Sequence, residues 1–137
     1  MSYLLDTNVV SETRRRQPEP KVMRWLEASG PDAHFVSVLT LGEITKGIVQ
    51  HRRRDPEGAD RLARWLGGLR TLFTERILVV GDAEATRWGD LAGRAELPVI
   101  DGLIAATALV HDLTLVTRNT RDFGLTGVRL LDPWQAG

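Results

Sequence analysis

Residues 3–10 read YLLDTNVV, and this stretch decides how the rest of the chain is interpreted. Its leucines and valines are typical of a short buried strand, yet Asp6, Thr7 and Asn8 stand in the middle of the apolar run. An unpaired carboxylate inside a protein costs several kcal/mol, or it is neutralised through a shift of its pKa. Either the strand ends at Asp6, or the fold needs that carboxylate.

Outward from this stretch, apolar runs alternate with segments of helical periodicity. Further strands are predicted at 34–38 (HFVSV), 76–80 (RILVV), 113–117 (LTLVT) and 128–132 (VRLLD). Helices are predicted over 18–29, 40–53, 58–73, 82–96 and 101–112, with Asp82 as an N-cap. Strands that alternate with helices indicate right-handed crossovers and a parallel sheet covered on both faces.

We therefore predict an α/β fold, a three-layer α/β/α sandwich with a short, mostly parallel sheet of four to five strands. Residues 1–137 are expected to form a single domain. The run RILVV lacks alternation, as in a strand buried on both faces. No signal peptide and no apolar stretch of roughly 20 residues is present, so a cytoplasmic protein without a membrane segment is expected.

Composition excludes several kinds of site. The chain has no cysteine, which excludes disulfides, thiolate metal ligands and a cysteine nucleophile. Its formal net charge is zero, so it is not a globally basic nucleic-acid binder. Arginines nevertheless cluster at Arg14–Arg16 and Arg52–Arg54. Arginine suits phosphate, but a charge run is usually a solvated face, and that is the interpretation taken for each cluster.

Four acids follow the predicted strands or lie just beyond them: Asp6, Glu43, Asp101 and Asp122. Ligands of such sheets bind outside the carboxyl ends of the strands, so these acids are expected to meet at one edge, with Asn8 and Asn119 as neutral oxygen donors. Gathered carboxylates repel one another unless a cation neutralises them, and oxygen ligands without cysteine suit Mg²⁺ or Mn²⁺. Such a cation polarises a phosphodiester and activates water for in-line attack.

Each acid also has a structural alternative. Asp6 fits a turn or a helix cap, and Asp101 fits a helix cap. Thr40 and Glu43 match a capping box, and Asp122 fits an ordinary loop acid. Only their joint placement after successive strands favours a site.

Other chemistries lack their motifs. No phosphate-binding glycine loop and no G-x-S-x-G occurs, and the histidines show neither metal-ligand spacing nor a triad pattern. Trp25, Trp65 and Trp88 lie at helical apolar spacing and are expected to pack rather than to stack on bases.

The segments LLDTNVVSE, LGEITKGI, DGLIAATAL and LVTRNTRDF together resemble the PIN-domain nucleases, and in particular the VapC-type toxins of toxin–antitoxin pairs with their FitB-like branch. The resemblance covers nearly the whole chain. It implies an α/β/α sandwich whose acidic pocket holds Mg²⁺ or Mn²⁺ and cleaves RNA. By position it assigns the acids to Asp6, Glu43 and Asp101.

The fourth acid of the family is assigned to Asp122, because Asn119 stands where relatives often carry aspartate. Whether one or two metals bind is left open by that substitution. Thr7, Asn8 and Thr117 match the polar residues that position the acids.

The resemblance also implies partners. These are an RNA substrate, a second copy in a homodimer, and a small antitoxin that covers an apolar groove around Val22, Trp25, Leu26 and Trp65 and through which the complex binds operator DNA. A non-catalytic PIN-like RNA-binding or scaffold module is the alternative. An aspartate-centred phosphatase fits less well, because it needs a second aspartate where Asn8 stands, and a receiver domain lacks its late lysine.

Overall fold

The structure is a computed structural model that describes residues 1–135, and its centre is a sheet of five short strands. These strands are β1 (Tyr3–Leu5), β2 (His34–Ser37), β3 (Ile77–Leu78), β4 (Thr114–Val116) and β5 (Leu130–Leu131). Their order is β3-β2-β1-β4-β5, and every neighbouring pair is parallel. The predicted α/β class is confirmed, and the sheet is parallel throughout.

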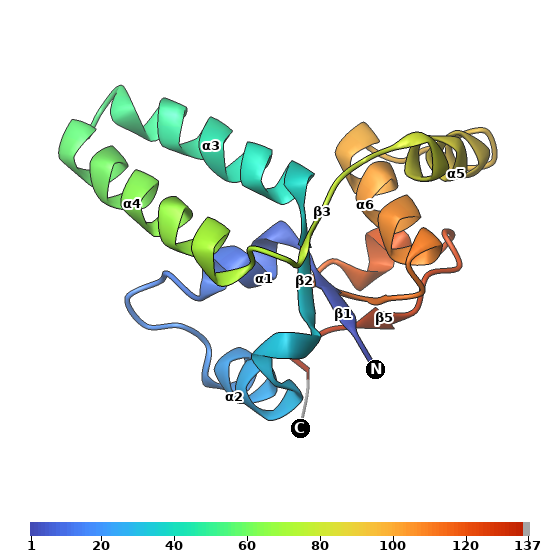
Figure 1. Ribbon diagram of the computed structural model, residues 1–137, viewed down its shortest axis with the longest axis horizontal. Coiled ribbons are helices and arrows are strands. Elements are labelled where there is room, and N and C mark those ends of the chain that lie inside the picture. Colours follow the sequence, from blue (N-terminus) through green and yellow to red (C-terminus); the bar gives the residue numbers. More distant parts are fainter. Residues whose placement is uncertain (136–137) are drawn as a thin grey trace.

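Helices cover both faces of the sheet (Figure 1). Within residues 1–135 they are α1 (Thr7–Glu12), α2 (Pro20–Ser29), α3 (Val38–Arg52), α4 (Pro56–Leu72), α5 (Asp82–Ala92) and α6 (Val99–Val110), with 3₁₀ turns η1 (Pro31–Ala33) and η2 (Thr120–Phe123). The helices α1–α4 pack on one face and α5 and α6 on the other. Adjacent Leu4 and Leu5 in β1 belong to opposite cores, because successive side chains of a strand point to opposite faces.

The strand in residues 3–10 ends at Leu5, which confirms the alternative that it stops at Asp6, whereas the expectation that Val9 and Val10 belong to it is wrong. Asp6 has extended backbone angles, and its carboxylate accepts a hydrogen bond from the Thr7 amide, so it is the N-cap of α1. Val9 and Val10 are buried as members of this helix rather than of a strand. An acid with extended backbone angles is a preferred start for a helix, so Asp6 both ends β1 and begins α1.

Two other details differ from the sequence prediction. The run RILVV pairs only through Ile77 and Leu78, at the edge of the sheet, and Val79 is 66% exposed. Ile77 packs against one core and Leu78 against the other, so helices cover both faces of β3 as predicted, but both side chains are only half-buried. The N-cap of α5 is Gly81 rather than Asp82, with the Glu84 carboxylate accepting from the Gly81 amide.

Trp25 and Trp88 pack against the cores as predicted, whereas Trp65 also lines a cavity, and this changes the expected apolar groove. Val22 is fully buried, and Trp25 lies edge-on to Tyr3 with ring centroids 4.9 Å apart, so neither forms an exposed groove. Leu26 does line an apolar cavity of about 380 Å³, together with Met23. None of the helices within residues 1–135 is long and apolar enough to cross a membrane.

His34 makes the stability of the fold depend on pH. It is buried at the start of β2, with Nε2 2.7 Å from Ser29 Oγ and its ring stacked on Trp25. Burial, and secondly the charge of Arg76, lowers the pKa of His34. The stability that depends on its neutral form is therefore present above the unfolded value of about 6.5 and is lost as pH falls through the folded pKa.

We expect the melting temperature to fall more steeply from about pH 7.5 to about pH 5.5 in the wild type than in His34→Phe. Phenylalanine keeps the stacking on Trp25 but does not titrate. Circular dichroism melts measure the difference, with His111→Gln as a control at a more exposed histidine. Equal pH slopes in the wild type and His34→Phe would contradict the assignment.

Candidate active site

Four carboxylates from four segments approach one another beyond the carboxyl ends of β1, β2 and β4. Asp6 lies between β1 and α1, Glu43 in α3, Asp101 in the first turn of α6, and Asp122 in η2. The pKa of Asp101 is raised, first by burial and then by the negative charges of Asp6, Glu43 and Asp122. The other three sequence-predicted acids thus all lie within electrostatic range of Asp101, and Glu43 also lies within range of Asp6.

Asp6 is the buried member of this group, with 6% of its surface exposed. Its Oδ2 accepts a hydrogen bond from the Thr117 hydroxyl at 2.8 Å, and its Oδ1 accepts from the Thr7 amide at 2.8 Å. Burial raises its pKa, the two hydrogen bonds oppose that rise, and the charge of Glu43 adds to it. The net effect is a raised pKa, so the fold holds a carboxylate that resists ionisation.

Thr117 connects the segments around Asp6. It is fully buried at the end of β4, and its hydroxyl accepts hydrogen bonds from Asn8 Nδ2 at 3.3 Å and from the Asn119 amide at 3.0 Å. Two donors already point at this oxygen, so its own proton is directed at Asp6. Asn8 in turn accepts from the Arg118 amide through Oδ1, which ties α1 to the segment after β4.

Thr7 links Glu43 to α1. The Thr7 hydroxyl donates to Glu43 Oε1 at 2.6 Å and lies 3.1 Å from the Thr40 hydroxyl. The capping-box alternative for Thr40 and Glu43 is wrong, because α3 begins at Val38 and its N-cap is Ser37, which accepts from the Leu39 amide. Thr40 is the residue at this site that the sequence interpretation missed, since the capping pattern offered another explanation for it.

Asp101 and Asp122 have no capping role either. The helix α6 begins at Val99 after Pro98, with no side-chain cap, so the capping alternative for Asp101 is wrong. Asp122 is exposed in a 3₁₀ turn rather than in an irregular loop. Asn119 precedes that turn, and its backbone amide donates a hydrogen bond to Thr117 Oγ1.

The arrangement fits a hydrated hard cation. Within residues 1–135 none of the four carboxylates forms an ion pair, although Asp6 and Asp101 both have raised pKa values. Within the same residues no three acidic or histidine side chains converge closely enough to enclose an ion by themselves. Mg²⁺ is usually held by one or two carboxylates and keeps several waters, so Asp6 and Asp101 would suffice as direct ligands.

Comparisons with known proteins agree with this geometry. A profile of the PIN domain matches residues 3–127. The chain is 33% identical to Toxin FitB of Neisseria gonorrhoeae, covering 96% of this chain and 97% of that one. It is 30% identical to VapC ribonuclease Y4jK of Sinorhizobium fredii, with 96% and 97% covered.

A solved structure shows the same fold. The crystal structure of FitAcB from Neisseria gonorrhoeae superposes with a TM-score of 0.90 at 32% identity, covering 97% of this chain and 99% of that one. The profile spans most of the chain, and two relatives of at least 30% identity align over almost its full length. The chain therefore belongs to the PIN-domain family, in its VapC/FitB-like branch.

Proposed function

We propose that this chain is a Mg²⁺- or Mn²⁺-dependent endoribonuclease that acts in the cytoplasm as the toxin of a toxin–antitoxin pair. The observation that carries the proposal is the approach of four carboxylates to one another without a protein cation among them. Relatives named as a VapC ribonuclease and as a toxin support it. A bound divalent cation would supply the positive charge that polarises the phosphodiester and activates the attacking water.

The burial of each acid indicates whether it would hold the cation directly or through water. Asp6 and Asp101 would hold the cation directly, because they are the more buried pair and both have raised pKa values. Glu43 and Asp122 are exposed and would act through water. Thr117 and Thr7 would fix the directions of the Asp6 and Glu43 carboxylates.

A phosphatase is not supported by the residue at position 8. Both ends of the Asn8 amide are engaged, Nδ2 with Thr117 and Oδ1 with the Arg118 backbone. Asn8 therefore serves to join two segments and lacks the carboxylate such a phosphatase needs. A non-catalytic RNA-binding module has no observation in its favour, since all four acids are present and the charges of the other three act on Asp101.

The proposed partners are an antitoxin, a second copy of the chain in a homodimer, and operator DNA bound through the antitoxin. Support comes from relatives of the same fold, among them a solved structure described as FitAB bound to the IR36 DNA fragment, with a TM-score of 0.88 at 30% identity. Size-exclusion chromatography with light scattering of the protein, alone and co-expressed with the product of any small open reading frame that adjoins its gene, measures both associations.

The deciding experiment is cleavage of total cellular RNA by the purified, antitoxin-free protein. Discrete fragments are expected with Mg²⁺ or Mn²⁺ and none with EDTA. Mapping the fragment ends identifies the substrate. Intact RNA under both metals, from protein that circular dichroism shows to be folded, would overturn the proposal.

Glu43→Gln is expected to keep the fold and to reduce cleavage about 10- to 100-fold, the usual loss when a group that positions a metal site is changed. The Gln oxygen can still accept from the Thr7 hydroxyl, whereas the negative charge is lost. Melting curves and cleavage rates measure the two effects. Full activity in a folded Glu43→Gln protein would return Glu43 to a structural role.

Asp101→Asn is expected to raise the melting temperature in EDTA at pH 7 by about 2–4 °C. The raised pKa means that the stability linked to Asp101 is present below its unfolded value, about 3.9, and is lost as pH rises through the folded pKa. The neutral amide in the Asp101→Asn variant does not ionise, so this stability is not lost at pH 7. Mn²⁺ should then stabilise the wild type more than the variant, and equal shifts would contradict a cation at Asp101.

A further inference from the structure

The two arginine clusters of the sequence converge on one groove. Arg14–Arg16 follow α1, and Arg52–Arg54 lie at the end of α3 and just beyond it. Although the clusters are nearly forty positions apart, Arg14 and Arg54 line the same cavity of about 460 Å³. This cavity lies among α1, α3 and α4, which are close together in Figure 1.

The other arginines of these clusters have different surroundings. Arg15 pairs with Glu12, and Arg52 pairs with Asp60 at 2.7 Å. Arg14, by contrast, forms no ion pair within residues 1–135. The interpretation of both clusters as solvated faces is therefore too coarse, because one arginine from each enters the groove.

The groove begins at the acidic site. Thr7 and Glu43 line one end of the first cavity, and a second cavity of about 510 Å³ adjoins it and reaches Arg61. The two share Arg14 and Trp65 in their walls. We call these two neighbouring cavities the channel; their walls include Thr7 and Glu43 in the first, Arg61 in the second, and Trp65 in both.

An aromatic ring and two guanidinium groups line the first of these cavities. The Arg14 guanidinium lies 5.9 Å from the centre of the Trp65 ring, which is only partly buried. Arg54 Nη2 donates to His51 Nδ1, while His51 Nε2 lies 3.2 Å from Asp55 Oδ2. His51 therefore binds one guanidinium nitrogen of Arg54, and the other N–H donors of Arg54 are free for a ligand.

We propose that this channel, lined by Arg14, Arg54, Arg61 and Trp65, binds the single-stranded RNA that flanks the scissile phosphate. The inference rests on the proposed function and adds the path of the substrate. A base stacks on Trp65 and on the Arg14 guanidinium plane, and Arg14 and Arg54 contact phosphates. Double-stranded RNA does not fit this chemistry, because its bases are stacked on one another and offer no free face.

The test measures binding separately from cleavage. Asp6→Asn protein is mixed with a fluorescein-labelled, unstructured 12-nucleotide oligouridine in Mg²⁺, and fluorescence anisotropy is followed. Adding Arg14→Ala and Arg54→Ala is expected to weaken binding about tenfold or more. The slope of the logarithm of the binding constant against the logarithm of the salt concentration should become shallower by about 1.4, or about 0.7 for each lost phosphate contact.

Arg16→Ala with Arg53→Ala is the matched control, since it removes the same charge from the same two clusters but from residues that line neither cavity. Trp65→Leu is expected to weaken binding at least about fivefold and Trp65→Phe much less, because phenylalanine keeps a stacking face. If Trp65→Leu does not fold, the arginine pairs decide.

Three results would overturn the channel: unchanged binding in the Arg14/Arg54 double variant, an equal loss in the Arg16/Arg53 control, or equal affinity for an RNA hairpin stem. Failure of the proposed function looks different. Wild-type protein would then cleave no RNA, while binding would still depend on Arg14 and Arg54.

Discussion

Asp6→Asn is expected to fold and to lose at least about 100-fold of the RNA cleavage rate, since changing even the partners of metal ligands typically costs 10–100-fold. Asparagine is as good an N-cap as aspartate, so α1 should still begin at Thr7. The amide lacks the negative charge that would bind a cation in the buried position between Thr117 and the Thr7 amide. Single-turnover cleavage in Mn²⁺ measures the loss, and circular dichroism measures the fold.

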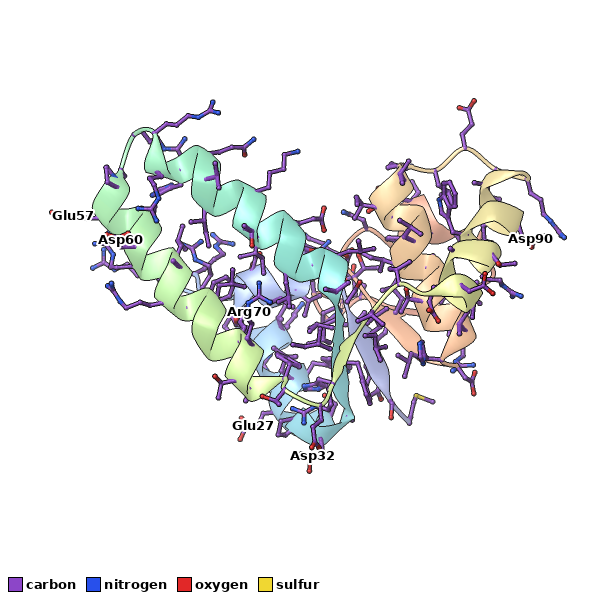
Figure 2. The ribbon with its side chains drawn as sticks, turned by 45° about the horizontal axis from the view of Figure 1, so that its top comes forward. Glu27, Asp32, Glu57, Asp60, Arg70 and Asp90 are labelled. Atoms are coloured by element: carbon purple, nitrogen blue, oxygen red, sulfur yellow. The ribbon has the colours of Figure 1, made fainter. Side chains whose placement is uncertain are left out.

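Asp32→Asn is the matched control for this change. Asp32 is exposed in η1, before the amino end of β2, and Figure 2 shows it at the periphery of the molecule. This variant should cleave RNA at the wild-type rate. Wild-type cleavage by Asp6→Asn itself would show that the carboxylate is only a helix cap.

Thr117→Val is expected to have the second largest effect, because it removes one hydroxyl and almost no volume. Asp6 Oδ2 would lose its hydrogen bond, and Asn8 and the Asn119 amide would lose their acceptor. A buried polar atom left without a partner costs about 1–3 kcal/mol. We expect a destabilisation of that size in urea denaturation, and about a 10- to 100-fold lower cleavage rate as the Asp6 carboxylate loses its orientation.

Two variants separate the hydroxyl from general effects on β4. Thr117→Ser keeps the hydroxyl and should retain cleavage close to the wild-type rate. Thr114→Val makes the same chemical change at the start of β4, away from the acids, where the hydroxyl accepts a hydrogen bond from Arg129 at 3.4 Å. If Thr117→Val and Thr114→Val cleave RNA equally well, Thr117 does not position Asp6.

Most of the fold could be predicted from local sequence patterns, and the errors of that prediction have a common cause. Period-3.6 spacing locates α2, α3 and α4 to within a few residues. The errors at residues 6–10 and in RILVV arise because apolar residues indicate burial but do not show whether the buried segment is a helix or a strand. Val9 is buried by a helix, and Val79 is exposed because β3 lies at the sheet edge. Both outcomes depend on where distant strands pair.

The candidate site was predictable in its acids and less so in its supporting contacts. Parallel strands bring their carboxyl ends to one edge, so Asp6 and Glu43, which follow β1 and β2, could be placed together. Asp101 follows another helix, and the family resemblance placed it. The link from Thr7 to Glu43 and Thr40 spans more than thirty residues and has no local signature. Contacts of this kind are set by the packing of α1 against α3, which the chain reaches only when folded.

One side chain, that of Asp6, both starts a helix and carries a charge of the site. If cells are selected for survival while the active protein is expressed, inactivating mutations at codon 6 should therefore differ in how much full-length protein they yield. Asparagine, one base change from aspartate, would accumulate as full-length inactive protein because it still caps α1. Alanine and valine, equally close in the genetic code, would remove the cap, and cellular proteases would clear much of the product. Inactive alleles at this codon would thus differ in abundance while sharing the same harmless phenotype.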